Sequence, residues 1–111
     1  CAVEKRKTDQ LFNRQYRGKQ YAQAVSTLRQ LWQTCAPPMH WLEEMSIRNN
    51  LAVTYAKMGD KDQCSKILQP YKKEIVSKNP MEERDPPVTY VFEEEYKVQL
   101  KNARYNWKLC Q

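Results

Sequence analysis

The chain contains four cysteines and a single histidine, the residue types most often used for redox, nucleophilic and metal chemistry. Four cysteines in 111 residues are typical of a protein that folds in an oxidising compartment, where they pair as disulfides. Four cysteines allow three pairings. The pairing that forms depends on the elements that carry them, at Cys1, Cys35, Cys64 and Cys110.

No arrangement of residues in the sequence indicates catalysis. His40 stands beside Trp41 and has no metal-ligand spacing to a Cys, Asp or Glu, so we expect a surface or packing histidine and no metal. No glycine-rich loop is present to bind phosphate, and no cysteine belongs to a Cys–His–Asp arrangement. The run from Glu93 to Glu95 is interpreted as a solvated helix face. We therefore expect neither enzyme activity nor a cofactor.

The net charge of +6 and the pI of about 9.2 would permit binding to nucleic acid, to an anionic membrane or to an acidic protein. Basic residues are concentrated before residue 20 and between 57 and 78, whereas 81–95 is acidic. With no Arg/Gly/aromatic RNA signature and no recognition helix, we expect no nucleic-acid binding. No run approaches the roughly 18 apolar residues of a membrane span, so we expect a soluble protein.

The spacing of apolar residues predicts one all-α domain that spans residues 1–111. Gly18 ends the first expected helix, and the prolines at 37 and 38 end the second. Pro70 is expected to kink or split the fourth, because proline removes a backbone hydrogen bond. The expected helices cover residues 7–15, 20–36, 39–58, 61–79 and 88–109, with a loop over 80–87.

The segment from Asn50 to Asp60 resembles the first helix and turn of a tetratricopeptide repeat (TPR). Ala52 stands where the family places a small residue, Tyr55 where an aromatic residue fills the hairpin, and Gly59 where the helix ends. The resemblance implies a TPR-like stack of two antiparallel helical hairpins plus a C-terminal capping helix.

The first hairpin carries a second match, with Tyr21, Ala24 and Pro37 at positions similar to those of the repeat. The apolar pattern then recurs after about 40 residues rather than the family's 34, which places about six extra residues at His40 to Met45.

Repeat stacks of this family use the first helix of each hairpin to line a groove for a peptide or a partner helix. Carried onto this chain, the resemblance implies that another protein or peptide is bound by Asn13, Tyr16, Asn49, Asn50, Val53 and Lys57. Asn13 and Asn50 stand where carboxylate-binding members hold the peptide backbone, but Asp9 replaces an expected lysine, so capture of a free C-terminus is not expected. In the alternative interpretation the asparagines only cap or solvate helix turns.

A second candidate anchor for a partner is the apolar stretch Met39, His40 and Trp41, which lies just after two prolines. The competing interpretation is that Trp41 packs in the core, because a helix extended by about six residues needs its own hydrophobic contact. We favour the groove.

Helix order selects one disulfide pairing. In an up-and-down arrangement Cys1 and Cys35 share one end of the stack, and Cys64 and Cys110 share the other. The remaining pairings would span helices of about 15 residues, or roughly 20 Å, whereas bonded cysteines have Cα atoms within roughly 7 Å. We predict the bridges Cys1–Cys35 and Cys64–Cys110. The alternative is that some of these cysteines are buried thiols.

The start of the chain offers a rival role for its first cysteine. Because the chain begins at Cys1 rather than Met, we expect that a leader or another segment has been removed. Cys1 followed by Ala2 is similar to the start of a mature bacterial lipoprotein, in which that cysteine carries lipid and forms no disulfide. Membrane association is expected only through such lipidation.

These observations predict a non-enzymatic protein-binding module of an extracytoplasmic space, either the bacterial periplasm or the exterior. The first hypothesis is an inhibitor or immunity-type protein that occludes a partner toxin or enzyme, because a small stapled frame with strong local charges suits one-to-one binding. The alternative is an adaptor or assembly factor of a secretion or envelope complex, with a lipid anchor as one form of it. An enzyme subunit is the hypothesis of another class, and it would require a deep pocket with converging polar side chains.

Overall fold

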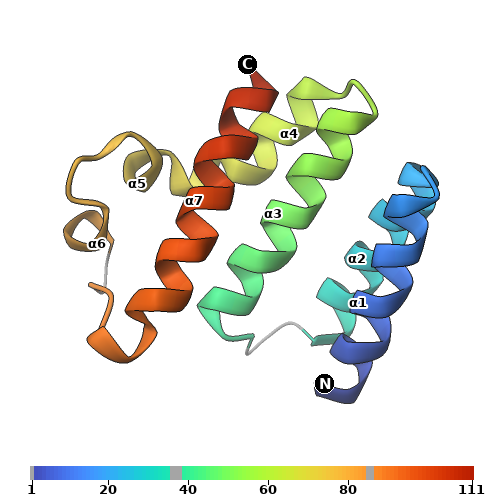
Figure 1. The fold of residues 1–111 in the computed structure, drawn as a ribbon, viewed down its shortest axis with the longest axis horizontal. Helices are drawn as coiled ribbons and strands as arrows, with labels where there is room; N and C mark the ends of the chain where they lie inside the picture. The colour runs from blue at the N-terminus through green and yellow to red at the C-terminus, as the bar shows by residue number, and fades with distance from the viewer. Residues whose placement is uncertain (1, 36–38, 85–86) are drawn as a thin grey trace.

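The structure, a computed structural model, describes residues 2–35, 39–84 and 87–111. All the regular secondary structure of these residues is helical, which confirms the all-α class (Figure 1). The elements are α1 (Ala2–Arg17), α2 (Tyr21–Cys35), α3 (Trp41–Lys57), α4 (Lys61–Leu68), the 3-10 turn η1 (Gln69–Tyr71), α5 (Lys72–Val76), α6 (Pro80–Glu83), the 3-10 turn η2 (Tyr90–Phe92) and α7 (Glu93–Cys110).

The turn between α1 and α2 is closed by backbone hydrogen bonds around Gly18. The Gly18 amide donates to the Arg14 carbonyl at 2.9 Å, and the Gln20 amide donates to the Gln15 carbonyl at 2.8 Å. Lys19 has a φ of 58°, the left-handed conformation with which many helices end. The two helices therefore run side by side in opposite directions (Figure 1).

The turn between α3 and α4 uses Gly59 and Asp60, as expected for a helix stop and restart. Gly59 has a φ of 80°, which glycine adopts without steric cost. The Asp60 amide donates to the Tyr55 carbonyl at 2.9 Å, and the Asp60 carboxylate accepts a hydrogen bond from the Gln63 amide at 3.1 Å. This carboxylate caps the first turn of α4.

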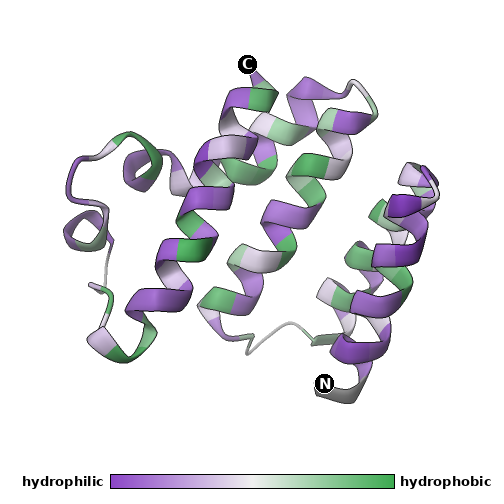
Figure 2. Ribbon diagram, in the orientation of Figure 1, coloured by the Kyte–Doolittle hydropathy of each residue, from purple (hydrophilic) through white to green (hydrophobic). Residues whose placement is uncertain are grey.

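α3 is the central helix, because α2, α4 and α7 all pack against it (Figure 1). Its buried residues consequently occupy most of its circumference: Leu42, Met45, Ile47, Asn49, Leu51, Ala52, Thr54 and Tyr55. Apolar positions are spread along α3 and α7 in Figure 2 rather than confined to one edge. The core is therefore built around α3, and the remaining helices cover it.

The seam between α2 and α3 combines stacking with hydrogen bonds. The Arg29 guanidinium donates to the Tyr55 hydroxyl at 2.7 and 3.0 Å. The Arg48 guanidinium lies over the Trp32 ring, 4.6 Å from its centroid. Arg48 also donates to the Ile67 carbonyl of α4 at 2.9 Å, so it joins three helices.

Cys64 and Cys110 form the predicted disulfide, with their Cα atoms 5.3 Å apart. The bridge joins the first turn of α4 to the last turn of α7, the ends that helix order had placed together. It indicates an oxidising compartment. The second predicted bridge, Cys1–Cys35, involves Cys1, which lies outside the described residues. This bridge therefore stays a prediction.

Three expectations about the second half of the chain need correction. The last helix, expected from residue 88, begins only at Glu93, after the 3-10 turn η2. The fourth helix does break at Pro70, where η1 separates α4 from α5, but it ends at Val76 and not near residue 79. The expected loop over 80–87 contains a short helix, α6, which begins with Pro80, since proline is well suited to a first helical turn. The first helix is also longer than predicted, because α1 already begins at Ala2.

Trp41, the alternative partner anchor, is half-buried and packs against the core. Its ring lies 5.8 Å from that of Tyr96 and 6.2 Å from that of Phe92, both centroid to centroid. The Arg84 guanidinium lies 4.0 Å from the Trp41 centroid. His40 caps α3, because its Nδ1 accepts a hydrogen bond from the Leu42 amide at 3.2 Å.

Candidate functional site

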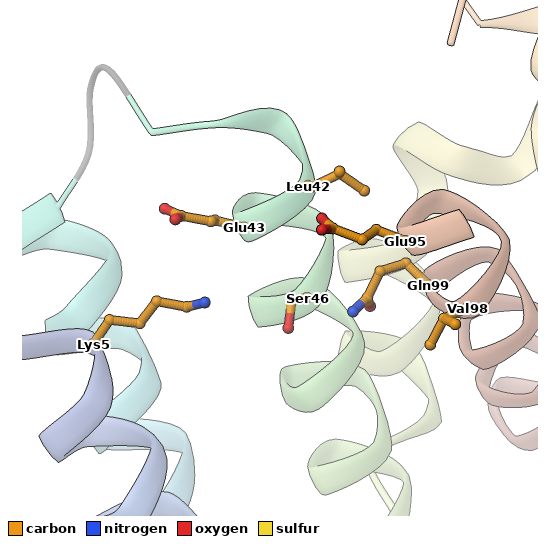
Figure 3. A pocket seen from close by; sticks show the side chains of 7 residues that line it. All are labelled: Lys5, Leu42, Glu43, Ser46, Glu95, Val98 and Gln99. Atoms are coloured by element: carbon orange, nitrogen blue, oxygen red, sulfur yellow. The ribbon is translucent and has the colours of Figure 1, made fainter. Parts of the chain in front are cut away.

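A hollow of about 300 Å³ lies where the first halves of α1, α3 and α7 face one another (Figure 3). Each of the three helices contributes side chains to it, and α3 forms the middle of the site (Figure 3). The lining residues are Lys5 from α1, Leu42, Glu43 and Ser46 from α3, and Glu95, Val98 and Gln99 from α7. We call this the α1/α3/α7 groove.

The α3 side of the groove continues beyond the hollow as a stripe of accessible residues. Glu43 and Ser46 are followed at helical spacing by Asn50, Val53 and Lys57, which are half-buried or exposed. The rest of this helix is largely covered by its neighbours. The accessible stripe therefore includes three of the four residues that the sequence predicted for a groove on α3.

Asn49, the fourth predicted residue of α3, does not face the groove. It is only 3% exposed, and its side-chain amide donates to the Gln99 carbonyl at 3.0 Å and to the Gln99 side-chain oxygen at 2.9 Å. The Asn106 side chain in turn donates to the Asn49 carbonyl at 3.1 Å. Because its polar groups are used within the fold, Asn49 fastens α7 to α3 and has no surface for a partner.

The two predicted residues of α1 lie away from the hollow. Asn13 is exposed and lines a separate shallow depression with Gln10, Arg14 and Arg17. Tyr16 is half-buried, and its ring lies 5.7 Å from Phe12 and 5.6 Å from Tyr21, centroid to centroid. Tyr16 therefore contributes to the packing of α1 on α2.

The groove carries both signs of charge. In Figure 3, Lys5 projects from α1 toward α3, Glu43 projects from α3, and Glu95 projects from α7. None of these three residues forms an ion pair with another described residue. Leu42 and the 58% exposed Val98 supply apolar surface beside them. Such a surface can bind a segment that has both apolar and charged side chains.

A buried charged cluster lies elsewhere, where α5 and the residue that follows α6 meet α7. The carboxylate of Glu74, which is 6% exposed, accepts a hydrogen bond from the Tyr96 hydroxyl at 2.6 Å and one from Arg84 at 3.4 Å. Burial and the bond to Glu74 raise the pKa of Tyr96 well above its usual value. All of these partners belong to the chain, so the cluster attaches the α5–α6 segment to α7.

Groups of three or more His, Cys, Asp or Glu side chains with the proximity needed to bind a metal ion do not occur among the described residues. Likewise, the described helices include none with the length and apolar character that a membrane crossing requires. Comparisons of the chain with protein-family models, with curated proteins and with solved structures found no match.

Sequence reasoning missed Lys5, Glu43, Ser46 and the three residues of α7 that line the hollow. One signal was available, because Glu43 and Ser46 share the helical register of Asn50 and Val53. For α7 no comparable signal existed, since a terminal helix interpreted as a cap was expected to cover the stack rather than border a groove.

Proposed function

We propose that this protein is a non-enzymatic protein-binding module that takes a segment of a partner protein into the α1/α3/α7 groove. The observation that carries the proposal is the hollow bordered by three helices, with charges of both signs that pair with no other described residue and an accessible stripe that continues along α3. A groove of this kind suits an extended peptide or an amphipathic helix.

The proposal includes a TPR-like arrangement of the helices. The packing of α2 on α3, and of α7 on both α3 and α4, is what consecutive hairpins followed by a capping helix require. The Cys64–Cys110 bridge supports a compartment outside the cytoplasm, for which we propose the bacterial periplasm.

Within this class we favour an inhibitor of the immunity type, one that occludes a toxin or an enzyme. The core helix α3 is held by neighbours on several sides and α7 is bridged covalently to α4, so the α3 and α7 walls of the groove are preformed before the partner arrives. A preformed surface loses little conformational entropy on binding, which suits tight one-to-one complexes.

Site-specific photo-crosslinking tests the groove. A photoreactive side chain at Ser46, inside the hollow, is compared with one at Ser26, which is exposed on α2. We expect one protein of the producing cell's envelope to be linked from Ser46 and not from Ser26. Labelling of the same set of proteins from both positions would overturn the proposal.

The captured protein then permits a quantitative test. Ser46→Arg should weaken its binding by at least about tenfold, because the larger cation fills the hollow. Ser26→Arg is the matched control and should leave the affinity unchanged. Equal affinities of the two variants would contradict the groove assignment. An inhibitor should also abolish the partner's activity at equimolar ratio, whereas an adaptor should leave the activity intact and bring a third component into the complex.

A further inference from the structure

The four basic residues of α7 lie on one side of the helix. Lys97, Lys101, Arg104 and Lys108 follow one another at steps of four, three and four residues, which places them along one face. All four line a second hollow, of about 490 Å³, together with Pro80 and Met81 of α6. This face lies across α7 from Glu95 and Val98 of the α1/α3/α7 groove.

The floor and wall of the second hollow are largely apolar. Leu100 and the fully buried Tyr96 form part of the floor, Met81 closes one side, and Tyr105 is 62% exposed beside them. A tyrosine in this position offers a large apolar ring and a hydroxyl to anything that settles on the helix.

Two of the four cations have partners within the chain, and two are available to a ligand. Arg104 donates to the Ile75 carbonyl at 3.0 Å and to the Ser77 carbonyl at 2.9 Å, which fixes the end of α5 beside α7. Lys97 pairs with Glu93 at 3.2 Å, and this carboxylate raises its pKa. Lys101 and Lys108 are exposed, and neither ammonium group forms a hydrogen bond or ion pair with a described residue.

We infer that this surface of α6 and α7 is a second docking site, which binds an acidic amphipathic helix of a partner protein. Lys101 and Lys108 lie two turns apart on α7, or roughly 10 Å. Two carboxylates that are also two turns apart on the partner helix match this spacing, and the apolar side chains of the turn between them then rest on Leu100 and Tyr105. The inference does not depend on the α1/α3/α7 groove.

The other end of α7 argues against a longer anion. Glu93, Glu94 and Glu95 occupy its first turn, and the Glu94 side chain is 91% exposed. A nucleic acid or an anionic membrane would bring negative charge against these carboxylates as well as against the lysines. A short acidic helix can cover only the later turns, so its charge meets the lysines alone.

The probe is a synthetic amphipathic helix with two Glu residues two turns apart and Leu residues between them, added to the isotopically labelled full chain. Changes in amide chemical shift should concentrate on α6 and on the second half of α7, with a Kd below about 1 mM. A peptide with Lys in place of both Glu residues should bind at least tenfold more weakly. Equal binding of the two peptides, or shift changes that avoid α7, would overturn the inference.

The matched variants are Lys101→Glu with Lys108→Glu, and Arg6→Glu with Lys7→Glu on the exposed side of α1. Both change the net charge equally, but only the first pair should weaken peptide binding by about tenfold or more. Circular dichroism verifies that both variants keep their helix content. Equal losses in the two variants would mean that binding follows net charge only and would refute the site. Stronger binding of anionic vesicles or of single-stranded DNA than of the acidic peptide would refute it as well.

Discussion

Removing the Cys64–Cys110 bridge should destabilise the protein by a large fraction of its total stability. The two cysteines are 46 residues apart, and in the chain-entropy treatment a loop of this length stabilises the folded state by about 4 kcal/mol. A small domain has only about 5–15 kcal/mol of unfolding free energy in all. Both cysteines are almost fully buried, so replacement by Ala also removes two buried sulfur atoms, and the lost packing adds to the destabilisation.

The assay is urea unfolding in a background in which Cys1 and Cys35 are replaced by Ala, so that any other bridge is absent. With a denaturant slope of about 2 kcal/mol per molar, Cys64→Ala with Cys110→Ala should lower the unfolding midpoint by about 2 M. A reductant should have the same effect on the background protein and no further effect on the double variant.

Two results would refute the reasoning. A loss of less than about 1 kcal/mol would mean that loop closure contributes little here, for instance because the denatured chain stays compact. Non-reducing peptide mapping of the unsubstituted chain that links Cys64 to Cys35 would mean that the helix order is wrong, since helix order places these two cysteines at opposite ends of the stack.

Three further predictions concern stability. Asn49→Ala should cost about 1–3 kcal/mol in urea unfolding, because it leaves the buried amide of Asn106 without one acceptor and the half-buried Gln99 without its donor. A loss below about 0.5 kcal/mol would mean that water replaces the Asn49 side chain. Gly59→Ala should cost about 1 kcal/mol through backbone strain alone, because its φ is 80° and no atom lies within 4 Å of an added Cβ; an unchanged melting temperature would contradict this. Burial raises the pKa of both Tyr71 and Tyr96 above the value of about 10 in an unfolded chain. The folded state therefore holds the two phenol protons more tightly than the unfolded state, and the stability that the neutral tyrosines provide is complete below about pH 10 and is lost as the pH rises further. Thermal unfolding from pH 8 to 12 checks this, with Tyr71→Phe expected to flatten the alkaline decline.

Most of the helices could be predicted from the sequence, because the residues that end or break them act locally. Gly18, Gly59 and Pro70 each act within one turn, and the structure shows a helix end or break at all three. Helix order then sufficed to pair Cys64 with Cys110, because the direction of each helix alone determines which end of the stack its cysteine reaches. The short helix α6 was not predicted, because a proline-rich run with few apolar residues shows no helical periodicity.

The candidate site was less predictable, for a reason that lies in α3. A helix with neighbours on several sides has apolar residues almost all round, so its pattern does not show which narrow stripe stays accessible. Asn49 and Asn50 are adjacent and chemically identical, yet one fastens α7 and the other borders the groove. Only the position of α7 distinguishes them, and that position is a long-range property of the fold.

The unequal attachment of the two sides of the groove has a consequence for dynamics. α1 packs mainly on α2, and this hairpin contacts α3 through the α2/α3 seam with Arg29 and Arg48. In contrast, α3, α4 and α7 all pack on one another, and a disulfide joins α4 to α7. The hairpin should therefore open as a cooperative unit of lower stability, and its amides should exchange with solvent sooner than those of α3 and α7. Since α1 forms one wall of the groove, a bound partner would close that opening, and slower hydrogen exchange would appear in α1 and α2 even at amides that the partner never touches.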